Sequence, residues 1–271
     1  MSQHFAEKLS RGLLQAMSRA FAAEALSERP GFLQGLDPRI KLIACLALIV
    51  SCVLTHSLLM LSGLFVLALL LALASQIPMA RLCTQVWLGV LLFTGAIALP
   101  ALVLVPGEAL WQLPLLHGQI TRQGLRSAAF LLGRAETSAT FAVLLILSTP
   151  WPHVLKAMRS LGVPVVLVAI LGMTHRYLFV LLHATTQLFE ARRSRLVAAM
   201  KGAQQRRLAA AAAGVLLSKS LQLSTDVHLA MISRGYRGEI HLLDEFHTRP
   251  RDWGILLCAL AVPALILWYQ R

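Results

Sequence analysis

The stretch between Lys41 and Arg81 contains no charged residue, and this feature limits the possible folds more than any other. About 20 apolar residues are enough for one helix to cross a bilayer, so the stretch is long enough for two helices. Its only polar interruption, Thr55-His56-Ser57, predicts a tight turn between helices near 40–55 and 58–76. Continuous apolar runs also exclude a porin-type barrel, whose strands alternate apolar and polar residues.

Three further apolar runs bring the prediction to about five membrane spans. Residues 82–107 carry no charge, and residues 125–147 carry only three charged residues, of which Arg134 and Glu136 lie well inside the run. The last run, 253–269, has aromatic residues at both ends, as is typical of helices that meet the lipid–water interface. Residues 108–124, which contain Pro114, Gly118 and Gly124, are predicted to form the loop between the third and fourth spans.

The composition supports a membrane protein with basic cytoplasmic segments. Hydrophobic residues make up 57% of the 271 residues, charged residues make up 14%, and the net charge is +13. In a soluble protein this charge would suggest nucleic-acid binding, but here it indicates cytoplasmic loops, so we expect no nucleic-acid partner. The four cysteines lie in apolar stretches without a Cys-x-x-Cys pair, which predicts buried thiols and no metal site.

The segment 164–183 is apolar enough to be a span, but the distribution of charge argues against a crossing there. If the N-terminus is cytoplasmic, four spans return the chain to the cytoplasm near Trp151. A crossing at 164 would place residues 184–252, with 11 of the 25 basic residues, outside the cell. We therefore expect a cytoplasmic N-terminal segment at 1–36, spans one to four within 37–150, a cytoplasmic helical region at 151–252 and the last span at 253–271.

Two stretches of the basic cytoplasmic region repeat one pattern. Residues 191–195 and 230–234 both read Ala-x-x-Ser-Arg, each near the end of a helical pattern. A glycine follows the second stretch and is typical of a helix end. The helix before it has one apolar stripe, which predicts contact with lipid or with a groove on a partner; its residues are Leu216, Leu223, Val227, Ala230 and Met231. The terminal arginines could pair with carboxylates there, or could be solvated helix ends near lipid phosphates.

Glu136 is the only acidic residue inside a predicted span. It lies two residues from Arg134, a separation at which helix side chains do not face each other. We expect Glu136 to form an interhelical ion pair or hydrogen bond rather than to act in a proton or ion relay. The sequence has no nucleotide-binding, metalloprotease or hydrolase motif, which predicts a non-catalytic chain without a cofactor.

Several of these residues resemble the transmembrane T component of energy-coupling factor (ECF) transporters, and within it the CbiQ type of cobalt and nickel uptake systems. Residues 36–42, Leu-Asp-Pro-Arg-Ile-Lys-Leu, resemble the start of that family's first span, and residues 161–164, Leu-Gly-Val-Pro, resemble the loop before its coupling helices. The family's pair of x-Arg-x motifs is matched by Ser194-Arg195-Leu196 and Ser233-Arg234-Gly235. Arg192 is the alternative first arginine, because Leu196 stands where the family usually has Gly, and Tyr236 extends the second motif.

The resemblance implies an all-α bundle of about five spans with long cytoplasmic amphipathic coupling helices. It implies an adaptor in an ATP-driven importer of a transition metal ion, with cobalt expected and nickel or a vitamin as alternatives. Each motif arginine would engage one of two ABC-type ATPase subunits, and the bundle would hold a substrate-binding membrane S subunit of the CbiM type. The expected location is the lipid bilayer of the bacterial cytoplasmic (inner) membrane, with several passes through it.

An alternative hypothesis is a membrane enzyme that acts on lipid phosphates, in which the cytoplasmic arginines bind the phosphate groups. Such chemistry usually requires a metal held by clustered carboxylates, and Asp244-Glu245 is the only adjacent acidic pair. A self-contained carrier would be expected to show repeated halves, which the sequence lacks. Co-purification of an ATPase subunit would favour the adaptor over both alternatives.

Overall fold

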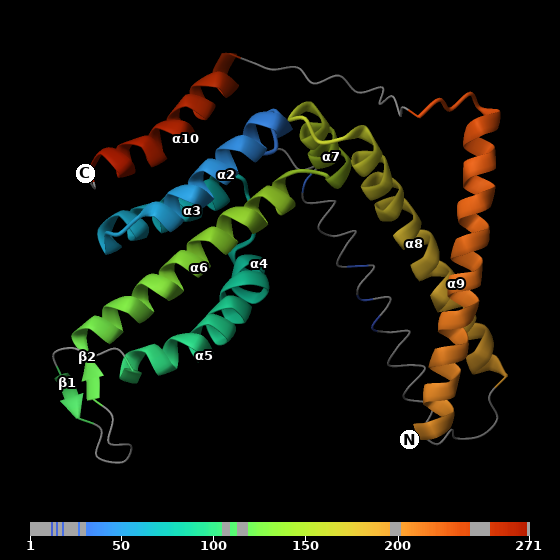
Figure 1. Cartoon of the computed structure of the whole chain (residues 1–271), viewed down its shortest axis with the longest axis horizontal. Coiled ribbons are helices and arrows are strands. Elements are labelled where there is room, and N and C mark those ends of the chain that lie inside the picture. Colours follow the sequence, from blue (N-terminus) through green and yellow to red (C-terminus); the bar gives the residue numbers. More distant parts are fainter. Residues whose placement is uncertain are drawn as a thin grey trace. The chain divides into compact units, whose positions relative to one another are not determined.

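The computed structural model describes residues 31–104, 109–112, 119–195, 202–238 and 250–269, together with four single positions nearer the N-terminus. Most of the predicted cytoplasmic segment 1–36 lies outside these residues. The chain divides into two units (Figure 1). We call residues 24–157 and 246–271 the bundle unit, and residues 1–23 and 158–245 the paired-helix unit.

Five helices of the bundle unit, α2, α3, α5, α6 and α10, overlap the five predicted spans. α2 packs against α3, α6 and α10, and α6 also packs against α3 and α5, so these two helices form the centre of the unit (Figure 1). A π-helical turn, η1, precedes α5. The bounds are α2 (Pro38–Leu54), α3 (Leu58–Ala74), α4 (Met79–Leu82), η1 (Cys83–Trp87), α5 (Leu88–Leu104), α6 (Arg122–Ser148) and α10 (Pro250–Tyr269).

Apolar side chains cover much of the outer surface of these helices. Leu59 is 81% exposed, Phe93 is 70% exposed and Trp268 is 78% exposed, as is expected where lipid replaces water. By length and composition, α6, α10 and α8 (Val165–Ser194) could each cross a membrane, while α3 and α5 are apolar but shorter. The predicted all-α membrane helix bundle is therefore confirmed.

The start of α2 shows why the sequence at 36–42 is polar at the edge of an apolar run. Asp37 is the N-cap, and its Oδ1 accepts a hydrogen bond of 3.0 Å from the backbone N–H of Arg39. Pro38 follows at the first helical position, where no backbone N–H is needed. Lys41 is only 5% exposed, and its Nζ donates to Ser148 O at 3.0 Å and to Thr149 Oγ1 at 2.8 Å. The N-terminal end of α2 is thereby joined to the C-terminal end of α6.

The predicted loop at 108–124 contains a short hairpin. β1 (Ala109–Gln112) and β2 (Gln119–Thr121) pair antiparallel, with an irregularity between Ala109 and Trp111. Thr121 then caps α6 by accepting a hydrogen bond of 3.0 Å from Gly124 N. Strands of four and three residues are too short for a period-two pattern to stand out in the sequence.

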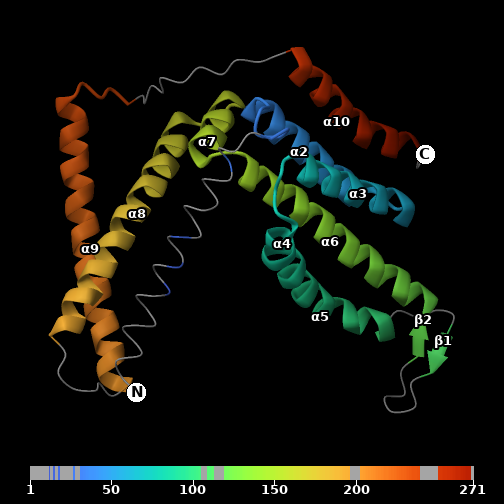
Figure 2. The same cartoon turned by 180° about the vertical axis from the view of Figure 1, so that it is seen from behind.

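The paired-helix unit is built from two long helices. α7 (Trp151–Ser160) leads into this unit, and α8 and α9 (Gly202–Ser233) contact each other (Figure 2). α8 buries Thr186 and Phe189, and α9 buries Ala212. All three residues lie within about three turns of the helix ends that the connection joins.

Candidate functional site

The segment before α8 turns sharply because of one glycine. Gly162 has a φ of +96°, a left-handed conformation that glycine adopts at little cost. Its N–H donates to Arg159 O at 3.2 Å, and Val163 N donates to Met158 O at 3.2 Å. These two bonds form a Schellman motif that ends α7, and Pro164 then opens α8. The sequence Leu-Gly-Val-Pro therefore encodes the turn from α7 into α8.

The two Ser-Arg motifs occupy equivalent positions at the ends of α8 and α9. Ser194 and Ser233 are the last residues of their helices, and each hydroxyl donates a hydrogen bond of 2.9 Å to the carbonyl oxygen three residues earlier. Arg195 N donates to Arg192 O at 3.1 Å, and Arg234 N donates to Met231 O at 3.1 Å. Arg195 thus has the same place relative to its helix as Arg234, whereas Arg192 lies inside α8.

The second motif ends in a complete Schellman motif. Gly235 has a φ of +82°, and its N–H donates to Ile232 O at 2.9 Å. The N–H of Tyr236 donates to Met231 O at 3.0 Å. This arrangement fixes Arg234 at the C-cap of α9, where a cation is favoured by the helix dipole. Leu196, the residue of the first motif that corresponds to Gly235, lies outside the described residues.

The motif side chains that the structure describes are accessible to a partner. Ser194, Arg195, Ser233 and Arg234 are exposed, and Tyr236 is half-buried. Within the described ranges of the chain, neither Arg195 nor Arg234 forms an ion pair. Both guanidinium groups are therefore available for a carboxylate that another molecule supplies.

The two motifs lie far apart along the paired helices. α8 ends at Ser194, close in sequence to the start of α9, and the second motif follows the far end of α9 (Figures 1 and 2). α9 has 32 residues, which at the rise of an α-helix makes it about 48 Å long. One partner of ordinary domain size would have difficulty contacting both arginines, so the spacing suits two separate partners.

The predicted apolar stripe of α9 is only one of two. Its members Leu216, Leu223, Val227 and Met231 are half-buried, and Ala230 is exposed. A second set, Leu217, Leu221 and Ile232, is 62%, 63% and 53% exposed. These three residues are four and eleven positions apart, which places them on one face of the helix. The amino-acid pattern did not reveal this face, because alanines and leucines occur on several sides of α9 and obscure a separate stripe.

The expected partner of Glu136 is absent from the described part of the bundle unit. Arg134, not Glu136, forms the interhelical hydrogen bond, from its Nη2 to Thr55 O at 2.6 Å. Both carboxylate oxygens of Glu136 are buried without a hydrogen-bond partner among the described residues. In the same part of the chain, no three His, Cys, Asp or Glu side chains group in a way that could hold a metal ion.

Comparisons with known proteins agree with the architecture. Residues 31–242 match the family CbiQ, described as cobalt transport protein. The uncharacterized protein MJ1571 of Methanocaldococcus jannaschii is 31% identical over 276 residues, which cover 100% of this chain and 94% of that protein. The uncharacterized protein MJ1089 of the same organism is 24% identical over 241 residues, which cover 88% of this chain and 89% of that protein. The chain is a multi-pass membrane protein and belongs to the CbiQ family of cobalt transport proteins.

Proposed function

We propose that this chain is the T component of an ECF importer, a non-catalytic adaptor that couples two ABC-type ATPase subunits to a substrate-binding membrane subunit. Closure of the ATPases on ATP would move α8 and α9. The bundle unit would pass that movement to the substrate-binding subunit of the CbiM type. Membership of a transport family supports the general assignment, and the ends of α8 and α9 support the coupling role.

The observation that carries the proposal is the equivalence of the two Ser-Arg helix ends. The two motifs, Ser194-Arg195 and Ser233-Arg234, have the same position at a helix end, the same serine hydrogen bond, and the same bond from the arginine N–H to the carbonyl three residues earlier. With about 48 Å of helix between them, each arginine would enter a groove on its own ATPase subunit and pair there with a carboxylate. In this scheme Arg195, rather than Arg192, is the first coupling arginine.

The proposal places the paired-helix unit at the cytoplasmic side of the membrane. α8 is long and apolar enough to cross a bilayer, but it belongs to the same unit as the basic helix α9. A crossing would carry the basic residues of α9 to the outside, against the positive-inside rule. We therefore assign 151–252 to the cytoplasm and the five spans of the bundle unit to the cytoplasmic membrane, of bacterial type by the resemblance.

The proposed substrate is a divalent transition metal ion, with cobalt favoured by the family description. Metal recognition would belong to the substrate-binding subunit, and this chain would respond to ATP through its partners. Nickel or a vitamin would use the same coupling apparatus with a different substrate-binding subunit.

Affinity purification from the native membrane in a mild detergent tests this assignment. We expect two ABC-type ATPase subunits and one further membrane subunit to be recovered with the chain. Recovery of the chain by itself, together with turnover of a lipid phosphate by the purified protein, would instead support a membrane enzyme.

A further inference from the structure

Glu136 lies near the middle of α6, and its acidic group is hidden inside the bundle unit. The residue is 14 positions after the start of α6 and 12 positions before its end, or about 21 Å and 18 Å along the helix. A glutamate side chain is too short to reach water at either end of such a span. The residue as a whole is half-buried, yet neither of its carboxylate oxygens is accessible at the surface.

Most of the described elements that pack against α6 carry no charged side chain. α6 packs against α2, α3, α5, η1 and β2. All of these except α2 lack Asp, Glu, Lys, Arg and His, and their only titratable side chain is the exposed thiol of Cys83. A counter-charge for Glu136 would therefore have to come from α2, from α6 itself or from α4, which packs against η1.

Glu136 faces away from α2 and toward the layer formed by η1 and α5. Arg134 donates to Thr55 O, just after α2, at 2.6 Å. Glu136, two residues further on, lies about 200° round the helix from Arg134. Thr140, one turn after Glu136 on the same face, accepts a hydrogen bond of 3.3 Å from Trp87 Nε1 of η1. The nearest cation in sequence is thus engaged on the opposite side of α6.

The cations of α2 are held at the far end of α6. Lys41 Nζ donates to Ser148 O at 3.0 Å, and Ser148 is 12 residues, or about 18 Å, along α6 from Glu136. Because α2 runs antiparallel to α6, Arg39 lies further away still. The other titratable groups of α2 are thiols, which belong to Cys45 and Cys52. None of these groups lies on the side of α6 that carries Glu136.

The remaining cations near this layer are also distant. Arg122 and Arg126 of α6 lie at least ten residues before Glu136, which is about 15 Å or more along the helix. The segment from α4 to α5 runs antiparallel to α6, and Trp87 is bonded one turn beyond Glu136. Arg81, six residues before Trp87, therefore lies further toward the C-terminal end of α6.

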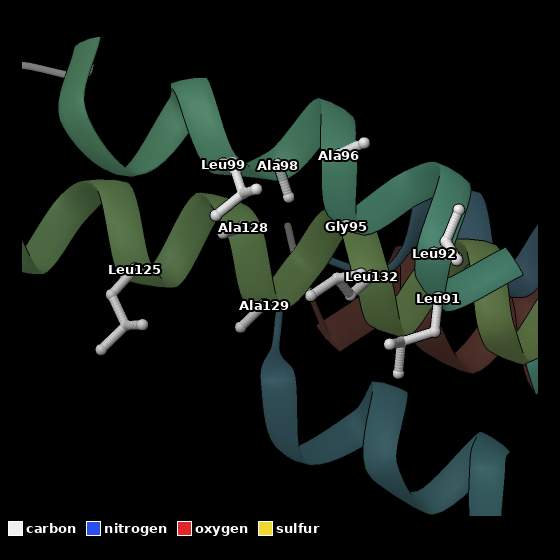
Figure 3. A pocket seen from close by; sticks show the side chains of 10 residues that line it. All are labelled: Leu91, Leu92, Gly95, Ala96, Ala98, Leu99, Leu125, Ala128, Ala129 and Leu132. Atoms are coloured by element: carbon white, nitrogen blue, oxygen red, sulfur yellow. The ribbon is translucent and has the colours of Figure 1, made fainter. Parts of the chain in front are cut away.

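Apolar side chains line the neighbouring part of the same face. One turn before Glu136, Leu132 lines an apolar cavity together with Leu91 and Leu92 of α5 (Figure 3). The residues that line this cavity are all Leu, Ala or Gly, and Glu136 is not among them. The cavity therefore supplies no polar partner and does not bring the carboxylate to the surface.

An ionised carboxylate at this position would be neither paired nor solvated. Both oxygens lack a hydrogen-bond partner among the described residues, and a cation from outside the chain cannot reach them because they are inaccessible. Burial of an unpaired charge costs far more than burial of a neutral polar group, so an acid in such a place takes up a proton instead. Protonation is the one form of neutralisation that needs no access for a second side chain.

We propose that Glu136 is a proton-binding site of the bundle unit. The folded chain holds it as a neutral carboxylic acid at neutral pH, and the bound proton lets α6 pack against η1 and α5 within the membrane. The site needs no partner subunit, so this inference is independent of the proposed function. It also requires no chain of proton carriers, since the proton remains bound while the bundle is folded.

Infrared difference spectroscopy of the purified full chain measures the protonation state directly. The spectrum of the unmodified chain minus that of Glu136→Gln, at neutral pH, should contain the C=O stretching band of a protonated carboxyl group. Glu190→Gln removes an exposed acid of α8 and is the matched control, which should lose only the bands of an ionised carboxylate. A Glu136→Gln difference that contains only ionised-carboxylate bands would overturn the proposal. Glu136→Leu removes the same group and serves for the comparison if Glu136→Gln does not fold.

The pH dependence of unfolding is a second measurement of the same proton. Glutamate in an unfolded chain ionises at about pH 4.3, so above that pH unfolding releases the proton that the folded chain holds. Relative to Glu136→Gln, the unfolding equilibrium constant of the unmodified chain should rise about tenfold per pH unit from about pH 5 to about pH 8. Relative to Glu190→Gln, it should change less than twofold over the whole range. A ratio to Glu136→Gln that does not change with pH would mean that Glu136 is already ionised in the folded chain, and the proposed site would be wrong.

Discussion

The Lys41 ammonium donates a hydrogen bond of 2.8 Å to Thr149 Oγ1, which joins the first turn of α2 to the residue that follows α6. A second bond, of 3.0 Å, reaches Ser148 O. Both partners are buried, and the residues lie more than 100 positions apart in the sequence. The lysine in the motif at the start of the first span is therefore a cap for another helix, where its charge also complements the dipole of α6.

Replacement of this lysine should destabilise the bundle unit. Lys41→Met keeps the length of the side chain but leaves a buried carbonyl and hydroxyl without their donor, which costs about 1 to 3 kcal/mol. We expect a lower thermal unfolding midpoint in detergent. Lys219→Met, at an exposed position on α9, is the control and should change the midpoint little. An unfolding midpoint for Lys41→Met equal to that of Lys219→Met would show that the buried bonds contribute nothing.

The membrane topology can be tested by cysteine labelling of intact cells. In a background without the four native cysteines, Gly118→Cys should react with an impermeant reagent added from outside, because 118 lies between the third and fourth spans. Gly202→Cys, at the start of α9, should react only after the cells are opened. Labelling of position 202 in intact cells would place the paired-helix unit outside and contradict the assignment of α8 to the cytoplasm.

The turn after α9 should depend on glycine at one position. Gly235 has a φ of +82°, so Gly235→Ala introduces strain of about 1 kcal/mol although no atom lies within 4 Å of the added Cβ. We expect faster amide hydrogen exchange around 232–236 and weaker ATPase binding. Gly214→Ala, inside α9 and equally open, should stabilise the helix instead. Identical exchange rates in the two variants would show that the Schellman motif does not stabilise the end of α9.

The proposed division of labour predicts that the isolated chain neither binds cobalt or nickel tightly nor hydrolyses ATP. Metal recognition and phosphate binding would then appear only when the partner subunits are added. Calorimetric titration of the purified chain with each metal ion, and a phosphate-release assay with ATP, test the two statements. Tight metal binding by the chain itself would place the substrate site here and not on a partner.

Much of the fold could be predicted because apolar run length and helix punctuation are local properties. The uncharged stretch after Lys41 and the turn at Thr55-His56-Ser57 predicted the bounds of α2 and α3 to within two residues. Gly235 predicted the end of α9, because a left-handed residue is what a Schellman motif requires. The hairpin of β1 and β2 was not predictable, since its strands are shorter than the pattern that identifies a strand.

Side-chain pairing between helices could not be predicted from the sequence, because it depends on how each helix is rotated against its neighbours. The prediction that Glu136 forms an interhelical bond was not met in the described residues, and Arg134 makes that bond instead. The sequence also showed both Ser-Arg motifs without deciding between Arg192 and Arg195. The matching hydrogen bonds of Ser194 and Ser233 show that Arg195 has the same position relative to its helix as Arg234, and this position is the reason that the proposal favours Arg195.

The coupling role of the two arginines gives the most direct test of the account. Loss of one partner from a desolvated charge pair costs about 2 to 5 kcal/mol, which is roughly 30-fold or more in affinity. An exposed arginine near lipid would cost about 0 to 1 kcal/mol. Arg234→Glu should therefore weaken ATPase binding and abolish uptake, while Arg192→Glu and Arg237→Glu, next to the motifs, should have smaller effects.

The decisive measurement is ATPase retention by the double variant Arg195→Glu with Arg234→Glu, purified from the native membrane with its partners. Both attachment points are then repulsive, so we predict that the ATPases are released, that cobalt uptake stops, and that the variant still inserts normally in the membrane. A double variant that keeps its ATPases and takes up cobalt at nearly the unmodified rate would contradict the adaptor mechanism.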